Sequence, residues 1–230
     1  MNSKYWYYLF FAGLLAELTA VAMGWNEVQL FTKPLLIVFL FAWFMVSAVK
    51  FSPLRYCIAA ALFFSWVGDV CLLMEARGPG WFMAGLASFL LAHIMYIIFF
   101  LRARRRQTAP KKWNIPVSAL IGVYAIGLVV FLYPYIGKLQ LPVAIYALTI
   151  ASMLVAALHA FDNSAVNAGR YCIAGAVLFL CSDSLLAINK FYHTFPAAGV
   201  CIMATYGLAQ FAIAKGSLLY LAGESGGKPV

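Results

Sequence analysis

The chain has 230 residues, of which 65% are hydrophobic and only 10% charged, and its formal net charge is +9. A soluble domain is close to half apolar and about a quarter charged, so this composition excludes an ordinary soluble protein. The mean hydropathy of +0.92 indicates a protein that crosses a membrane several times.

Eight apolar windows follow one another along the chain. A helix of about 20 apolar residues crosses a hydrocarbon core about 30 Å thick. We predict helices over residues 5–23, 33–49, 56–74, 81–101, 113–135, 139–159, 171–190 and 195–215. The connections are short, so we expect one all-α membrane domain over residues 1–230. The first window lacks a small-residue cleavage site, and we expect it to be a retained span rather than a signal peptide.

Basic residues concentrate on one side of the predicted bundle. With eight helices both termini lie on the same side, and that side holds twelve of the 16 Lys and Arg residues. The other four are Lys33, Arg77, Lys138 and Lys190. Because cytoplasmic loops are enriched in Lys and Arg, we expect cytoplasmic termini, in a bacterial inner membrane. The cluster from Arg102 to Lys112 is expected to set this topology and meet anionic lipids, not to bind nucleic acid.

Two segments of the chain begin with the same five residues. Arg-Tyr-Cys-Ile-Ala occurs at residues 55–59 and again at 170–174, 115 residues later. This favours two parallel four-helix repeats, residues 1–110 and 111–230, and such repeats often form a site where they meet. The aspartates that follow, Asp69 and Asp183, are 114 residues apart, so one copy is displaced by one residue. Chance similarity between two apolar helices is the alternative.

Three carboxylates are predicted at one depth in the membrane. At 1.5 Å per residue, Asp69 and Asp183 lie ~21 and ~20 Å from the cytoplasmic edge, and Glu17 lies ~18 Å along the first helix. A charge near the middle of a spanning helix costs about 2.5–3.5 kcal/mol on insertion scales, so it usually faces a polar cavity and has a function. We therefore predict a site around Asp69 and Asp183.

Five further polar residues are candidates for this site. His93 and Tyr96 share one helix face, and Tyr206 and Gln210 share another, since they are three and four residues apart. Lys33 begins the second predicted span. Each has a structural alternative: His and Gln can hydrogen-bond between helices, Tyr can anchor at the membrane interface, and Lys can extend to the headgroups. Counted from Trp81, His93 is ~18 Å from the outer edge and the aspartates are ~9 Å from it. Either tilted or overlong helices close this gap, or His93 and Tyr96 line a deeper part of the cleft.

Other kinds of catalytic site have no support in the sequence. No His-x-x-x-His spacing exists, and His159 and His193 are predicted near opposite membrane faces, so neither a metal site nor a cofactor is expected. A Gly-rich phosphate loop is also absent, and no Ser, His and Asp residues stand in a recognisable catalytic context. Carboxylate acid–base chemistry remains. One carboxyl protonates a substrate while the other supports an oxocarbenium-like cation or activates water.

Five motifs, in order along nearly the whole chain, resemble the YhhN-like membrane family, which includes the lysoplasmalogenases. They are Lys33-Pro34, Ser65-x-x-Gly68-Asp69 with Leu72-Leu73-Met74, Phe82 to His93-x-x-Tyr96, Gly175-Ala176-x-x-Phe179-x-x-Ser182-Asp183-Ser184, and Tyr206-x-x-Ala209-Gln210. The resemblance implies an eight-helix enzyme that hydrolyses the vinyl-ether bond of lysoplasmalogens. The products would be a fatty aldehyde and a glycerophospho-alcohol.

The resemblance also implies roles for individual residues. Asp69 and Asp183 are the expected catalytic pair, with the proton donor left open between them. The expected substrate-orienting residues are Glu17, Lys33, His93, Tyr96, Ser182, Tyr206 and Gln210, with Lys33 near the phosphate. The expected partners are a lysophospholipid substrate and membrane lipids, and the oligomeric state is not specified. A transporter that uses its intramembrane acids is the alternative, and a receptor or lipid-binding protein is a third.

Overall fold

The computed structural model describes residues 3–48, 52–107, 112–161 and 165–226, and in these ranges it is helical without strands. The helices are α1 (Ser3–Ala22), α2 (Asn26–Ser47), α3 (Pro53–Leu73), α4 (Pro79–Arg105), α5 (Ile115–Ile136), α6 (Gln140–His159), α7 (Val166–Ala187) and α8 (Ala198–Gly226). Short 3₁₀ turns, η1 (Glu75–Arg77) and η2 (Gly137–Leu139), follow α3 and α5, and the π-helical η4 (Ile188–Tyr192) continues α7. The predicted all-α class is confirmed.

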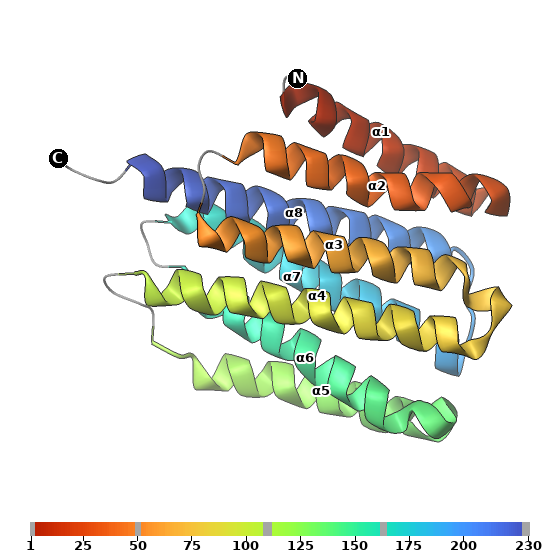
Figure 1. The fold of residues 1–230 in the computed structure, drawn as a ribbon. Coiled ribbons are helices and arrows are strands. Elements are labelled where there is room, and N and C mark those ends of the chain that lie inside the picture. Colours follow the sequence, from red (N-terminus) through yellow and green to blue (C-terminus); the bar gives the residue numbers. More distant parts are fainter. Residues whose placement is uncertain (1–2, 49–51, 108–111, 162–164, 227–230) are drawn as a thin grey trace.

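Seven helical segments of the described ranges are long and apolar enough to cross a membrane. The count is seven because η2 joins α5 and α6 without a break, so that they form one segment of 45 residues, Ile115–His159. Within it the backbone reverses at Gly137, where φ is +62°, and α5 and α6 lie side by side (Figure 1). The multi-pass membrane class is confirmed, while the predicted eight separate crossings are close to the observed count but not identical with it.

Four predicted helix boundaries are wrong by more than one turn: the starts of α2 and α7 and the ends of α4 and α8. Helix α2 begins at Asn26, so Pro34 lies inside the helix and does not open it. Helix α8 continues to Gly226, and Lys215 is accommodated with its Nζ atom 4.5 Å from the centre of the Tyr171 ring. An apolar window measures the thickness of the hydrocarbon core, whereas a helix continues as long as its backbone hydrogen bonds do. The predictions therefore located the spans but not their ends.

The helices form one bundle with both termini at the same end (Figure 1). We call this end the terminus end, and the end that carries η1, η2 and η4 the loop end. Arg102, Arg104 and Arg105 lie in the last turn of α4, at the terminus end. Three further basic residues that support the predicted topology, Lys50, Lys111 and Lys228, lie outside the described residues.

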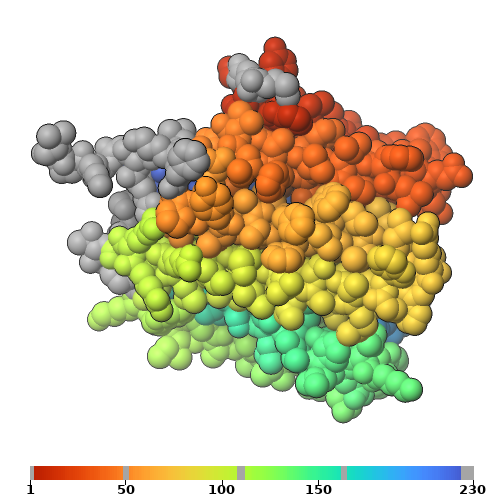
Figure 2. Space-filling model, viewed as in Figure 1, coloured from red at the N-terminus to blue at the C-terminus, as the bar shows by residue number. Residues whose placement is uncertain are grey.

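The outer surface of the bundle is apolar. Figure 2 shows α2, α3 and α4 adjoining one another on one face. Large side chains such as Phe31, Phe63 and Leu120 are exposed. In a soluble protein such residues would be costly to expose to water, but in a lipid bilayer these apolar side chains contact the hydrocarbon chains of the lipids.

Helices α7 and α8 pack closely because glycine occupies their contact points. A Cβ atom at Gly175 of α7 would lie 2.8 Å from the Ala209 carbonyl oxygen. A Cβ atom at Gly216 of α8 would lie 2.7 Å from the Ala168 carbonyl oxygen. Small residues at these positions let the two backbones approach each other, as is common between membrane helices. This packing holds the α7 carboxylate of Asp183 and the α8 phenol of Tyr206 on one side of the bundle core.

Candidate active site

Asp69 is held in the bundle by residues from two other helices. It lies on α3, four residues before the last helical residue, Leu73, and is 2% exposed. The Tyr206 hydroxyl of α8 donates a hydrogen bond of 2.6 Å to Asp69 Oδ2. Lys33 Nζ of α2 lies 3.7 Å from Asp69 Oδ1. The carboxylate therefore has both a hydrogen-bond donor and a positively charged counter-ion.

Asp183 has a similar but not identical environment. It lies on α7, and its side chain is 13% exposed. The Tyr146 hydroxyl of α6 donates a hydrogen bond of 2.5 Å to Asp183 Oδ2. His93 Nε2 of α4 lies 3.9 Å from the same oxygen. Each aspartate thus pairs with one phenol and one nitrogen, but only Asp69 has a lysine.

Both aspartates line one cavity of about 760 Å³, part of which is open to the surroundings. The cavity wall is otherwise mostly apolar. Its apolar residues include Leu72, Phe82, Leu86, Phe89 and Val143. A cavity with an apolar wall and two carboxylates suits a ligand that combines a hydrocarbon chain with one reactive polar group.

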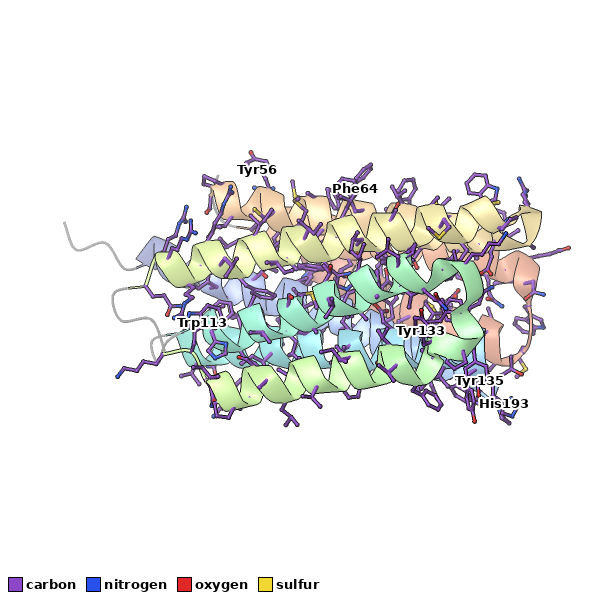
Figure 3. All side chains as sticks on the ribbon, turned by 90° about the horizontal axis from the view of Figure 1, so that it is seen from below. Tyr56, Phe64, Trp113, Tyr133, Tyr135 and His193 are labelled. Atoms are coloured by element: carbon purple, nitrogen blue, oxygen red, sulfur yellow. The ribbon has the colours of Figure 1, made fainter. Side chains whose placement is uncertain are left out.

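The loop end of the cavity carries charged residues. Lys190 of η4 lines the cavity and forms an ion pair with Glu75 of η1. Its Nζ atom also lies 5.1 Å from the centre of the Phe82 ring. Figure 3 shows Tyr133, Tyr135 and His193 at the same end of the bundle, whereas Trp113 lies at the opposite end. Among the candidate residues, Ser182 also lines the cavity, and its hydroxyl donates to the Ile202 carbonyl oxygen at 3.0 Å.

Tyr96 and Gln210 meet each other away from the cavity wall. The Tyr96 hydroxyl donates to Gln210 Oε1 at 2.5 Å, and Gln210 Nε2 donates to Ser65 Oγ at 2.8 Å. All three side chains are fully buried, and they connect α4, α8 and α3. They do not line the cavity that Asp69 and Asp183 share. The role of Tyr96 and Gln210 in orienting substrate stays a prediction. Their hydrogen bonds fix the side chain of Gln210, which lies one helical turn from Tyr206 on α8.

Glu17 also lies behind the cavity wall. It is buried on α1, where it accepts a hydrogen bond from Thr32 of α2, and it interacts electrostatically with Lys33. The structure therefore places Glu17 next to the lysine that faces Asp69. Its contact with a substrate is not supported, because it does not line the cavity.

His93 lies beside Asp183, with 3.9 Å between His93 Nε2 and Asp183 Oδ2. Of the two expected arrangements, the structure has the one in which overlong or tilted helices close the gap in depth. Helix α4 begins at Pro79 and runs for 27 residues, and α7 continues into η4, so the two helices do not end at one level.

Two residues of the site were missed in the sequence. Tyr146 is one of 13 tyrosines, and nothing in its neighbourhood distinguishes it from an interfacial anchor. Lys190 was counted only for topology. Among the described residues, no group of three or more His, Cys, Asp or Glu side chains is arranged to hold a metal ion.

The fold and the site define a multi-pass membrane protein with two aspartates that face one mostly apolar cavity. The family model described as the YhhN family matches residues 28–217. The chain belongs to this family, and the resemblance seen in the motifs is confirmed. All five motifs lie within the matched residues, whereas Glu17 precedes them.

Relatives of this chain occur in bacteria and mammals. Proteins named lysoplasmalogenase from Mycobacterium bovis and Mycobacterium tuberculosis are each 33% identical over 167 residues, which are 70% of this chain and 60% of the relative. A lysoplasmalogenase of Rattus norvegicus is 30% identical over 197 residues, 85% of this chain and 74% of the relative. The chain thus spans less than two thirds of the mycobacterial relatives. No solved structure matches it.

Proposed function

We propose that this protein is a membrane hydrolase that cleaves the vinyl-ether bond of lysoplasmalogens. The observation that carries the proposal is that Asp69 and Asp183 line the same, mostly apolar cavity. The relatives named lysoplasmalogenase support the choice of substrate. A lysophospholipid has one hydrocarbon chain and one charged headgroup, and it fits a cavity with an apolar wall and lysines at its loop end.

The chemistry requires one proton donor and one anion. A carboxyl group donates a proton to the vinyl carbon farther from the ether oxygen, and the positive charge is then shared by the nearer carbon and the oxygen. A carboxylate beside this oxocarbenium ion stabilises it, as in glycoside hydrolysis. Water adds to the charged carbon and loses a proton, and the resulting hemiacetal separates into a fatty aldehyde and a glycerophospho-alcohol. Asp69 and Asp183 are the two groups that we assign to these tasks.

The charged loop end orients the lipid. Lys33 was the predicted contact of the phosphate, but its Nζ atom faces Asp69 and its side chain is only 15% exposed. Lys190 lines the same cavity and its side chain is 38% exposed. We therefore assign the phosphate to Lys190, and the role of counter-ion of Asp69 to Lys33. The hydrocarbon chain would then lie along Leu86 and Phe89.

A direct assay tests the proposal. Purified protein in detergent is incubated with a lysoplasmalogen, and aldehyde release is measured, with an ester-linked lysophospholipid as the negative control. Asp69→Asn and Asp183→Asn are each expected to abolish turnover, because Asn neither donates a carboxyl proton nor carries a negative charge. Glu27→Gln, which changes an exposed acid at the start of α2, is the matched control and should retain activity.

Three results would contradict the proposal or part of it. Full activity in either Asn variant would exclude the paired-carboxylate chemistry. A requirement for added metal would exclude catalysis by side chains alone. Uptake of a small solute into proteoliposomes without any lipid turnover would favour the transporter that the intramembrane acids also suggest.

A further inference from the structure

His93 presents a hydrogen-bond acceptor to the site. Its Nδ1 atom lies 2.6 Å from the Phe89 carbonyl oxygen. A carbonyl oxygen only accepts hydrogen bonds, so Nδ1 carries the proton in this contact. In a neutral imidazole the other nitrogen, Nε2, then has a free lone pair. This nitrogen points to Asp183, the residue that also accepts from Tyr146.

The Nε2 atom of His93 is buried and has no hydrogen-bond partner among the described residues. In a second histidine, His159, both ring nitrogens have hydrogen-bond partners. His159 makes the same type of contact through Nδ1, 2.8 Å from the Val155 carbonyl oxygen, but its Nε2 accepts a hydrogen bond of 2.8 Å from the Asn114 backbone N–H. Both ring nitrogens of His159 thus form hydrogen bonds within the protein, whereas only Nδ1 of His93 does.

Two acceptors that face each other need a donor between them. His93 Nε2 and Asp183 Oδ2 are 3.9 Å apart, too far for a direct hydrogen bond. His93 does not itself line the cavity, but Asp183 and Tyr146 beside it do, so a water molecule that enters from the cavity when these side chains move apart can donate one hydrogen to each atom. The rings of Tyr146 and Phe179 pack against the imidazole, with ring centroids 5.4 and 4.7 Å from its own, and hold its orientation.

We infer that His93 and Asp183 hold the water molecule that attacks the oxocarbenium carbon, and that Asp183 is the proton donor of the reaction. This inference rests on the proposed hydrolysis. Asp69 then takes the second role, because Lys33 at 3.7 Å and the Tyr206 hydroxyl at 2.6 Å together support its negative charge. No lysine or arginine forms an ion pair with Asp183 in the described part of the chain.

The proton balance closes with these assignments. Asp183 gives its proton to the vinyl carbon and becomes a carboxylate, while Asp69 stays negative beside the cation. The water held by His93 Nε2 and Asp183 forms a bond to the charged carbon. Its proton passes to Asp183, which is thereby restored, and the hemiacetal separates into aldehyde and alcohol. His93 acts as a positioning residue and is itself unchanged at the end of the cycle.

Deuterium exchange tests this division of roles. If His93→Phe slows only the capture of the cation by water, protonation of the vinyl carbon becomes reversible. In D₂O the substrate recovered from this variant should carry deuterium at the vinyl carbon farther from oxygen, and aldehyde release should fall about 100-fold, the scale of the loss when a reacting group is misplaced by ~1 Å. Substrate recovered from the unaltered protein should stay unlabelled. Asp183→Asn should show neither release nor labelling.

Matched variants separate this role from a structural one. His159→Phe removes the other buried imidazole and should retain activity without labelling the substrate. His93→Gln supplies an amide oxygen as the acceptor and should restore part of the activity. If His93→Phe does not fold, His93→Asn, whose amide reaches less far, replaces it.

The possible results are distinct. Normal turnover by His93→Phe, or lost turnover with unlabelled substrate, would overturn the role of His93. Labelling by Asp183→Asn would overturn its role as proton donor. No aldehyde release by the unaltered protein would overturn the proposed function itself, and the inference with it.

Discussion

At the scale of single residues, Asp69 and Asp183 differ in the partner that accompanies their tyrosine. Asp69 has the ammonium group of Lys33, and Asp183 has the imidazole of His93. The sequence presents these two aspartates as equivalent, since they follow the same five-residue motif. In the mechanism that we propose, their surroundings suit each aspartate to a different chemical task. A carboxylate with a fixed counter-ion suits electrostatic stabilisation, and one beside a neutral acceptor suits proton transfer.

Substitution of the two cavity lysines should separate catalysis from binding. Lys33→Met removes the counter-ion of Asp69, so kcat should fall. Lys190→Met removes the more exposed charge at the loop end, so KM should rise by up to about fivefold with little change in kcat, as for loss of a partly exposed ion pair. Lys138→Met, at an exposed lysine of η2 outside this cavity, is the control. The measurement is aldehyde release over a range of lysoplasmalogen concentrations. A fall in kcat without a change in KM for Lys190→Met would contradict its assignment to the phosphate.

At the scale of helices, the position of the α7 and α8 residues depends on two glycines. Gly175→Ala places a Cβ atom 2.8 Å from the Ala209 carbonyl oxygen, so the helices must move apart. Overpacking of this kind costs about 1–3 kcal/mol. The thermal unfolding midpoint of the protein in detergent should fall. Gly127→Ala of α5, where no atom lies within 4 Å of the new Cβ, is the control and should leave the midpoint unchanged or raise it. Equal midpoints for the two variants would show that α7 and α8 adjust without cost.

Helices were predicted well from the sequence, and their ends and relative heights were not. Apolar length is a local property, so every helix was found. Helix ends depend on backbone hydrogen bonds outside the hydrocarbon core, which is why Pro34 was placed at the start of α2 and not inside it. Relative height depends on packing between helices, which is why the sequence left open whether His93 lies level with Asp183 or deeper. Tyr146 was missed for the same reason, since only tertiary packing brings α6 to α7.

At the scale of the whole molecule, the duplication of two four-helix halves stays a prediction, and two contacts support it. Tyr96 and Gln210 are 114 residues apart, the same offset as between Asp69 and Asp183. If a two-fold axis relates the halves, residues at equivalent positions near this axis must face each other. Tyr96 and Gln210 form a hydrogen bond, and the two aspartates face one cavity. The axis would therefore run through the polar centre of the bundle, which is where parallel repeats form their sites.

The orientation of the bundle decides from which side the substrate enters. The terminus end carries the arginines of α4, and cytoplasmic loops are rich in such residues, so we expect this end in the cytoplasm. The cavity carries Lys190 at the loop end and would then open toward the opposite side of the membrane. In a variant without the five native cysteines, Arg77→Cys at the loop end should react with a membrane-impermeant maleimide in intact cells. Arg106→Cys at the terminus end should react only after permeabilisation. The reverse pattern would place the cavity mouth in the cytoplasm, and the headgroup would then be presented from the inner leaflet.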